Sequence, residues 1–371
     1  MGPEGELRID LRLQGDSVQR VEVHSTRPDV AGRVLQGRTR AEIGAAVPLL
    51  FSICGRSQAA ASELACAAAA GETLDAAALQ RCSVAVAAET MREGAWRTLL
   101  DWPLWIGEKP SDEAVAAARA SLALAAAAPP ASAQATRTAI ANAVFGAPAV
   151  DWLALDSAAD LARWADAGQT AAARFIRRVR DDEAAAAARA APARQQVTLL
   201  QHRDHPAWVG QIVQAADADR SFARHPTWRG APAETGALAR LQAEPLLGPL
   251  AANAATRVQA RFVARLRELA LLLAARTWPA VGALALSGQR GVSWVETARG
   301  LLIHQVGIHQ DCVRHYRIVA PTEWNFHPQG ALALALSGEP AADVEALQQR
   351  AKRLVQSLDP CVACRVEVTD A

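Results

Sequence analysis

Apolar and polar residues alternate at the start of the chain. Every second residue from position 7 to position 13 is Leu or Ile, the stretch QGDS interrupts the run, and Val21 and Val23 resume it. A period of two places the apolar side chains on one face of a strand, and Gly and Asp favour a turn. The pattern therefore predicts an amino-terminal β-hairpin.

From about Ala41 the chain becomes rich in alanine, with interruptions at DWPLW, APPAS and FGAPAVDW. Alanine is the strongest helix former, and Pro and Gly mark the breaks between helices. Tracts such as DEAAAAARAAPARQQ carry charges at helical spacing, which indicates amphipathic helices rather than linkers. A further long helix is predicted for AATRVQARFVARLRELALLLAA. The middle of the chain is thus expected to be mostly helical.

Strand patterns return near the other end, in CVRHYRIVAP and in the terminal CRVEV. Strands at both ends with helices between them predict an α+β, predominantly α-helical fold, in which the amino-terminal hairpin lies near the carboxyl-terminal strand. We expect residues 1–371 to form a single interleaved domain.

Charge and hydropathy exclude several classes of protein. The chain has 39 basic and 38 acidic residues, a net charge of +1, so it lacks the basic excess of a nucleic-acid-binding protein. The amino terminus, MGPEGELRIDLRL, has no apolar core of a signal peptide. No run approaches the roughly 18 to 20 apolar residues needed to span a bilayer. We expect a cytoplasmic protein without a membrane span.

The chain has six cysteines, and Cys361 and Cys364 form a Cys-x-x-Cys pair. Such a pair can be a redox dithiol, two ligands of a metal site, or incidental. A redox dithiol of the thioredoxin type needs a helix after its first cysteine, and only seven residues follow Cys364. A closed zinc site needs four ligands, and the other cysteines form no second close pair. Further metal ligands would therefore come from distant parts of the chain.

The motif FSICGRSQAAAS places Cys54 and Gly55 just before a helical segment, where the helix dipole favours a thiolate. With the terminal DPCVAC, this sequence resembles the large subunit of nickel-iron hydrogenases, in which four thiolates hold nickel and an iron that carries cyanide and carbon monoxide. Four further segments resemble the family in the same order, so the matches run from residue 3 to residue 364: PEGELRIDLRL, GAPAETGALARL, ETARGLLIH and YRIVAPTEWNFHP.

The departures from the family pattern concern nickel. Ser57 stands where the family has a cysteine that bridges nickel and iron, and a serine hydroxyl is a poor ligand for a soft site. Ala61 replaces the family's helix histidine, and Glu367 stands where the family's mature chain ends in histidine. The resemblance leaves three thiol positions as metal ligands: Cys54, Cys361 and Cys364.

The surroundings of the iron are retained. Arg299 matches the arginine that binds one cyanide, and Thr322 matches the hydroxyl that donates to the other. Leu302 matches the apolar wall beside carbon monoxide, Asp359 an aspartate that orients the arginine, and Glu4 the proton-relay glutamate.

This pattern is similar to the HupK/HoxV-type accessory proteins of hydrogenase assembly. The resemblance implies a scaffold or metallochaperone that carries the Fe(CN)2(CO) fragment, without stoichiometric nickel and without catalysis. Its expected partners are the hydrogenase large-subunit precursor and HypC/HypD-type maturation proteins. Two alternatives stay open: an active hydrogenase-like metalloenzyme with an incomplete thiolate set, and a degenerate subunit that holds no metal.

Overall fold

The computed structural model describes residues 5–27, 30–51, 53–124, 130–188, 196–200 and 207–370. The chain forms two compact units, each assembled from separate segments. The first unit takes Met1–Cys82, Ala190–Ala239 and Ala280–Ala371, and the second takes Ser83–Arg189 and Arg240–Pro279. The expectation of a single domain stays a prediction. Within the described ranges, none of the helices has the length and apolar character needed to span a bilayer.

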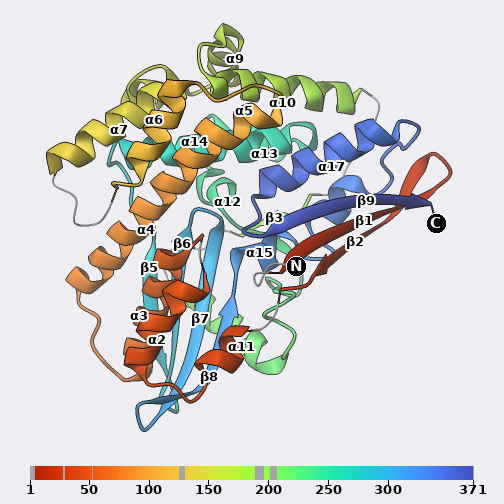
Figure 1. The fold of residues 1–371 in the computed structure, drawn as a ribbon. Coiled ribbons are helices and arrows are strands. Elements are labelled where there is room, and N and C mark those ends of the chain that lie inside the picture. The colour runs from red at the N-terminus through yellow and green to blue at the C-terminus, as the bar shows by residue number, and fades with distance from the viewer. Residues whose placement is uncertain are drawn as a thin grey trace. The chain divides into compact units, whose positions relative to one another are not determined.

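The amino-terminal hairpin and the last strand share one sheet of the first unit (Figure 1). Its order is β2-β1-β9, with bounds Ser17–Ser25, Glu6–Gln14 and Ala363–Asp370. β1 is antiparallel to β2 and parallel to β9, and Leu7 lies opposite Cys364. The alternating residues of β1 are buried, with Ile9 and Leu11 fully so. The predicted approach of the two ends of the chain is confirmed.

A second sheet of the first unit has four antiparallel strands in sequential order: β5 (Val281–Leu286), β6 (Arg290–Thr297), β7 (Gly300–His309) and β8 (Cys312–Val319). The sequence pattern predicted β8 alone. β7 is buried at every position but its last, so it shows no alternation of apolar and polar residues. Helix α3 (Gly55–Ala69) lies so close to β6 that a Cβ at Gly291 would stand 2.3 Å from the carbonyl oxygen of Ala65.

The remaining elements of the first unit are helices and one short parallel pair of strands. Thr39 caps helix α2 (Arg40–Leu50) through a reciprocal capping box with Glu42. The strand pair is β3 (Thr198–Leu199) and β4 (Ala233–Glu234). The other helices are α1 (Val30–Leu35), α2 (Arg40–Leu50), α11 (Ala207–Ala218), α15 (Pro321–Asn325), α16 (Ala331–Leu336) and α17 (Val344–Leu358).

Among the described residues of the second unit, every regular element is a helix, which confirms the predicted helical middle. Its core includes Trp102, Phe175 and Phe262, whose ring centroids lie 4.5 to 5.3 Å apart. Helices α4 (Ala76–Trp96) and α12 (Ala237–Leu241) cross its boundaries. The other elements are π-helical η1 (Arg97–Asp101), α5 (Trp102–Trp105), α6 (Asp112–Ser121), α7 (Pro130–Phe145), α8 (Ala149–Trp152), α9 (Ala158–Ala167), α10 (Ala171–Ala187), α13 (Leu247–Ala252), 3-10 helix η2 (Ala254–Thr256) and α14 (Arg257–Leu273).

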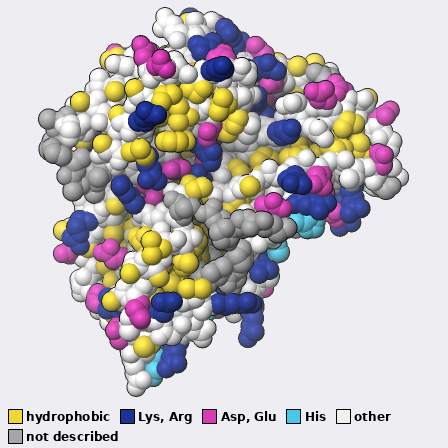
Figure 2. Space-filling model, in the orientation of Figure 1, with side chains coloured by type: hydrophobic (Ala, Val, Ile, Leu, Met, Phe, Trp, Pro, Cys, Tyr) yellow, Lys and Arg dark blue, Asp and Glu magenta, His cyan; other side chains and the backbone are white. Residues whose placement is uncertain are grey.

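Charged side chains of both signs are interspersed on one face of the molecule (Figure 2). On the face drawn in Figure 2, acidic and basic groups lie among one another, with no broad area of a single sign. This distribution agrees with the net charge of +1 and differs from the basic footprint of a nucleic-acid-binding surface.

Candidate functional site

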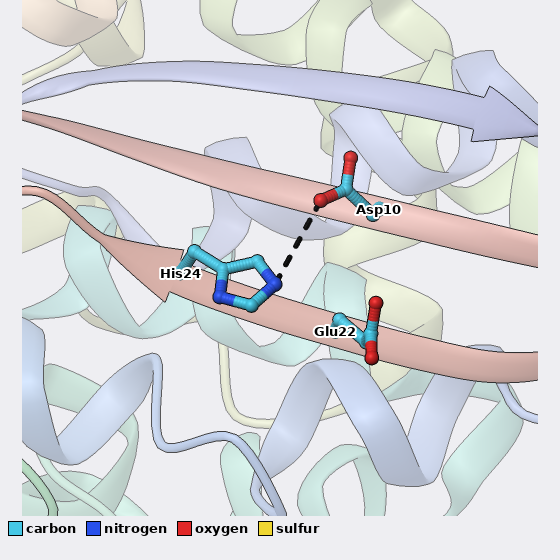
Figure 3. Close-up of side chains that lie close together, drawn as sticks. All are labelled: Asp10, Glu22 and His24. Carbon is cyan, nitrogen blue, oxygen red and sulfur yellow. Dashed lines mark ion pairs between the residues drawn. The ribbon is translucent and has the colours of Figure 1, made fainter.

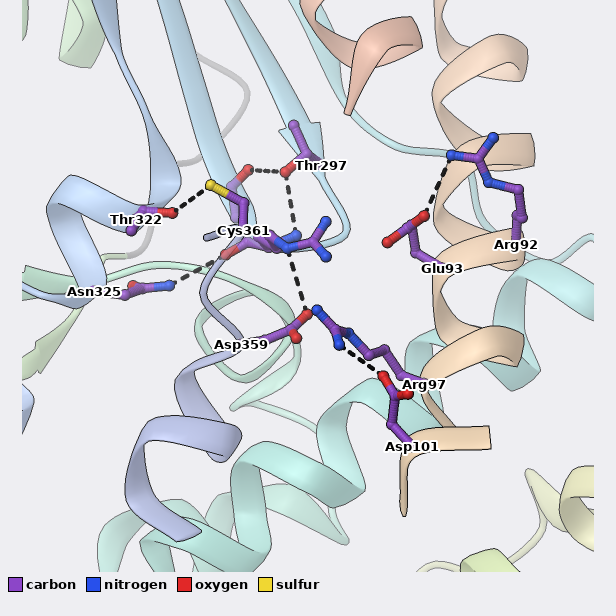
Figure 4. Close-up of polar contacts among 11 residues, drawn as sticks. Arg92, Glu93, Arg97, Asp101, Thr297, Thr322, Asn325, Asp359 and Cys361 are labelled. Carbon is purple, nitrogen blue, oxygen red and sulfur yellow. Dashed lines mark hydrogen bonds and ion pairs between the residues drawn. The ribbon is translucent and has the colours of Figure 1, made fainter. Parts of the chain in front are cut away.

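Cys361 lies just beyond helix α17, after the turn made by Asp359 and Pro360. Its Sγ is 3.2 Å from the hydroxyl oxygen of Thr322, on the short helix α15 (Figure 4). Thr322 is 3% exposed, whereas Cys361 is half-buried. The sulfur therefore combines a fixed hydroxyl neighbour with access for a ligand.

Arg299 stands at the tip of the hairpin between β6 and β7 and faces Asp359. The Nε atom of Arg299 is 3.7 Å from an Asp359 carboxylate oxygen, and the two side chains are 5% and 10% exposed. Asp359 ends α17 in the left-handed conformation, with φ of 50°, which Asp tolerates better than most residues. This backbone turn directs the carboxylate to the arginine and the following cysteine to Thr322. The predicted pairing of Arg299 with Asp359 is present in the structure.

Asn325 anchors the hairpin tip that carries Arg299. Its amide nitrogen donates to the Arg299 carbonyl at 3.2 Å, and its oxygen accepts from the backbone N–H of Thr235 at 2.9 Å. Gly300 follows Arg299 with φ of 130°, and a Cβ there would stand 2.2 Å from the Thr235 hydroxyl oxygen. Glycine is required at this position by both the conformation and the close approach. Two polar contacts and a glycine thus fix where Arg299 enters the site.

Cys54 is the residue that precedes helix α3. Such a position exposes free backbone N–H groups and the positive end of the helix dipole, both of which favour an anionic sulfur. The amide nitrogen of Gln58, one turn along α3, donates to Cys54 Sγ at 3.8 Å. Ser57, which stands in place of a bridging cysteine, is fully buried on the same helix.

The remaining predicted residues lie on strands or outside the described residues. Cys364 is half-buried on β9, and burial, with a smaller effect of the Glu6 charge, raises the pKa of its thiol to about 12. Leu302 lies on β7 opposite Val295 and is 1% exposed, as an apolar wall requires. Glu4 falls outside the part of the chain that the structure describes.

A partly buried ion pair that the sequence did not reveal lies beside the thiols. Arg27 donates to the carboxylate of Glu323 at 3.2 Å, and the side chains are 17% and 15% exposed. Burial opposes the charge of Arg27, but attraction by Cys361, Glu323 and Cys54 overcomes this effect and raises its pKa above the usual value. Burial also raises the pKa of Glu323, against the attraction of Arg27. One guanidinium is therefore held within electrostatic reach of two sulfurs from opposite ends of the chain.

The three thiols are not gathered into a closed set. The side chains of His, Cys, Asp and Glu carry the atoms that can act as metal ligands. Among the described residues, Asp10, Glu22 and His24 form the group of three whose ligand atoms all lie within 4.8 Å of one another (Figure 3). Cys54, Cys361 and Cys364 do not meet this distance together, and their assignment as ligands stays a prediction.

The Asp10, Glu22 and His24 group belongs to an ion-pair ladder on the face of the hairpin. Arg8 binds Asp10 at 2.8 Å, and Arg12 binds Glu22 at 3.0 Å. Arg20 binds the other oxygen of Glu22 at 3.1 Å. These guanidinium groups neutralise the carboxylates and oppose a further cation. Two similar pairs lie in the second unit, Arg92 with Glu93 and Arg97 with Asp101 (Figure 4).

Comparison with known proteins identifies the fold of the chain. The family model for nickel-dependent hydrogenase matches residues 250–367. The solved structure of the Ni-Fe-Se hydrogenase from D. vulgaris Hildenborough in the reduced state is similar over 94% of both chains, with a TM-score of 0.57 and 16% sequence identity. An NAD+-reducing [NiFe]-hydrogenase in the H2-reduced state gives a TM-score of 0.56 at 17% identity over 94% of both chains. These likenesses establish a fold of the hydrogenase large-subunit type.

Curated relatives match over nearly the whole chain. The hydrogenase expression/formation protein HoxV of Cupriavidus necator is 31% identical, with 93% of this chain and 92% of the relative covered. HupK of Rhizobium leguminosarum bv. viciae is 32% identical, over 99% and 97% of the two chains. HupK of Azotobacter vinelandii is 31% identical, over 99% of both. The chain therefore belongs to the HoxV/HupK family of hydrogenase expression/formation proteins.

Proposed function

We propose that this protein acts in hydrogenase maturation as a carrier of the Fe(CN)2(CO) fragment and does not itself catalyse a reaction. The relatives are named as expression/formation proteins, which supports a role in assembly. The observation that carries the more specific proposal is the Arg299–Asp359 pair beside Cys361 and Thr322. Burying a guanidinium is costly unless it is paired, and Asp359 supplies the partner that holds Arg299 charged beside the cysteine.

The donors at the site suit an iron that carries diatomic ligands. Cyanide is an anionic hydrogen-bond acceptor, so Arg299 and the Thr322 hydroxyl can each donate to one. Leu302 offers apolar contact to carbon monoxide. Thiolates are the soft ligands that such an iron accepts, and we assign this role to Cys54, Cys361 and Cys364.

Arg27 adds a charge argument to this assignment. An iron held by thiolates and cyanides carries net negative charge, and the Arg27 guanidinium, already attracted by Cys361 and Cys54, compensates part of it. Glu323 balances Arg27 when no cargo is bound. The site can therefore accept an anionic fragment without a large unpaired charge in either state.

Several features favour transient binding over turnover. Ser57 leaves at most three of the family's four thiolates, too few for its two-metal core, so we expect no stoichiometric nickel. The thiols are also not gathered in advance, so part of the binding free energy is spent in bringing them together. Transfer needs only the exchange of iron–sulfur bonds between two proteins, in which the thiol proton passes from the acceptor cysteine to the released one. No oxidant or reductant is required.

We infer that the cargo passes between HypC/HypD-type maturation proteins and the large-subunit precursor of a hydrogenase.

The test is complementation of cells that lack this chain, followed by measurement of iron in the purified large-subunit precursor. Wild type should restore the iron and Cys361→Ala should not. Cys312→Ala is the matched control, because Cys312 is equally half-buried but lies on β8. Full restoration by Cys361→Ala would contradict the carrier role. Hydrogen oxidation by the purified chain itself would support the enzyme alternative.

A further inference from the structure

A hydrogen-bonded chain runs from Cys54 into the core of the first unit. Gln58 donates through its amide nitrogen to Cys54 Sγ at 3.8 Å, and its oxygen lies 2.8 Å from Nε2 of His304 on β7. Nδ1 of His304 lies 2.8 Å from the hydroxyl of Tyr316 on β8. Gln58, His304 and Tyr316 are 2%, 0% and 5% exposed. Water therefore does not compete for the contacts among these three side chains.

Burial decides the protonation of the imidazole. Desolvation lowers the pKa of His304 to about 3, so the ring is neutral near pH 7, with one nitrogen donating and the other accepting. The oxygen of Gln58 can only accept, so the proton of His304 belongs on Nε2. Nδ1 then accepts from the Tyr316 hydroxyl, which also has a hydrogen bond with Ser62. Every donor in this arrangement points toward Cys54.

The opposite arrangement is chemically distinct. With the proton on Nδ1, Nε2 would accept from the Gln58 amide group, and the Gln58 oxygen would face Cys54. That oxygen would then need a hydrogen from the thiol. A sulfur bound to a metal has no hydrogen to donate, so this arrangement would leave the buried oxygen of Gln58 unpaired. The direction of these hydrogen bonds therefore decides whether the sulfur of Cys54 is able to act as a metal ligand.

We propose that Gln58 is a positioning residue, which His304 and Tyr316 lock in the one orientation that presents its N–H group to the sulfur of Cys54. The sulfur is thereby kept as a hydrogen-bond acceptor, the state in which it binds a soft metal. That Cys54 binds iron rests on the proposed function, whereas the direction of the hydrogen bonds does not.

A purely structural role is the competing explanation, since buried polar groups commonly satisfy one another. In that case the three core groups would need each other but not the thiol. The two explanations differ in what is expected at Cys54 when Gln58 is changed.

The orientation can be measured directly by NMR of the uniformly 15N-labelled full chain, purified without cargo. The His304 signal is assigned by its loss in a His304→Gln spectrum. The proposal predicts a protonated Nε2 and an unprotonated Nδ1 near neutral pH. A protonated Nδ1 would overturn it, because Gln58 would then face Cys54 with its oxygen.

The effect on the sulfur is measured by alkylation with iodoacetamide, followed by mass spectrometry of the modified peptides. Gln58→Met keeps the side-chain length and removes both polar atoms. Cys54 in this variant should react roughly fivefold more slowly than in wild type, the factor expected for one net hydrogen bond. Cys361 in the same sample is the internal reference and should be unchanged.

Gln305→Met is the matched control, because Gln305 is similarly buried on β7 but binds Asp217 instead. Its Cys54 should react as in wild type. Equal Cys54 rates in Gln58→Met and wild type would overturn the proposal, and if Gln58→Met does not fold, the NMR result alone decides. Both measurements use cargo-free protein, so their outcome does not depend on whether the chain carries iron.

Discussion

The hydroxyl oxygen of Thr322 lies 3.2 Å from Cys361 Sγ, although 39 positions separate the two residues in the chain. α15 and the turn after α17 create this contact, and Arg299 is anchored to α15 through Asn325. The site is therefore held by contacts between three distant segments, and each segment can be tested separately.

Thr322→Val keeps the shape of the side chain and removes its hydroxyl. Hydrogen bonds to charged groups are among the stronger ones, so the variant should hold bound iron roughly tenfold more weakly. The measurement is iron retention during anaerobic dialysis. Thr369→Val, on the exposed part of β9, is the control and should behave as wild type. Unchanged retention in Thr322→Val would mean that the hydroxyl does not contact the cargo.

Asn325 should matter for stability as well as for the site. Asn325→Ala leaves the buried backbone N–H of Thr235 without its acceptor and should lower the free energy of unfolding by about 2–3 kcal/mol. Asn325→Asp keeps this acceptor, but it loses the donor to the Arg299 carbonyl and buries a carboxylate beside that oxygen. We expect urea denaturation at neutral pH to show a larger loss of stability for Asp than for Ala. A loss well below about 1 kcal/mol in Asn325→Ala would contradict the role of this side chain as the anchor of the hairpin tip.

His304 predicts a pH dependence of stability. Its pKa is about 3 in the folded chain against the ordinary histidine value of 6.5, so the unfolded chain binds the proton first as the pH falls. The contribution of the neutral imidazole is complete above about pH 6.5 and is lost toward pH 3, at about 1.4 kcal/mol per pH unit. His304→Gln should remove this part of the slope in urea unfolding measured between these pH values. Identical slopes in the two proteins would refute the assignment.

Ser57→Cys tests whether the missing thiolate adjusts release of the cargo. A fourth thiolate should retain or increase bound iron while lowering hydrogenase maturation in cells. Ser293→Cys introduces a thiol at another fully buried serine of the first unit and controls for the added sulfur. If Ser57→Cys holds iron more tightly and still matures hydrogenase as well as wild type, Ser57 does not set the release.

The sequence predicted those elements whose pattern is local. β1 and β2 alternate because one face is buried, and β9 alternates in sequence although its apolar residues are only partly buried. β7 was not predicted because both of its faces are buried, which removes the alternation that identifies a strand. The amphipathic helices were recognisable from alanine content and charge spacing.

The residues of the site also fall into two groups, those that sequence motifs identified and those that they did not. The cysteines, Arg299, Thr322 and Asp359 were identified from motifs that stand as short stretches of sequence. Arg27 was missed because its partner Glu323 is 296 positions away and Arg27 itself belongs to none of the recognised motifs. Gln58 looked like an ordinary residue of a helix, and only the approach of β7 to α3 gives it a role. Contacts of this kind depend on tertiary packing and leave no local pattern.

Infrared spectroscopy of the anaerobically purified chain, with metal analysis of the same sample, tests the central claim most directly. Protein produced in cells with an active maturation system should show bands of carbon monoxide and cyanide on iron, with at most one iron per chain and no stoichiometric nickel. Cys361→Ala should lose these bands. Stoichiometric nickel, or the absence of carbonyl and cyanide bands from wild type under these conditions, would contradict the account.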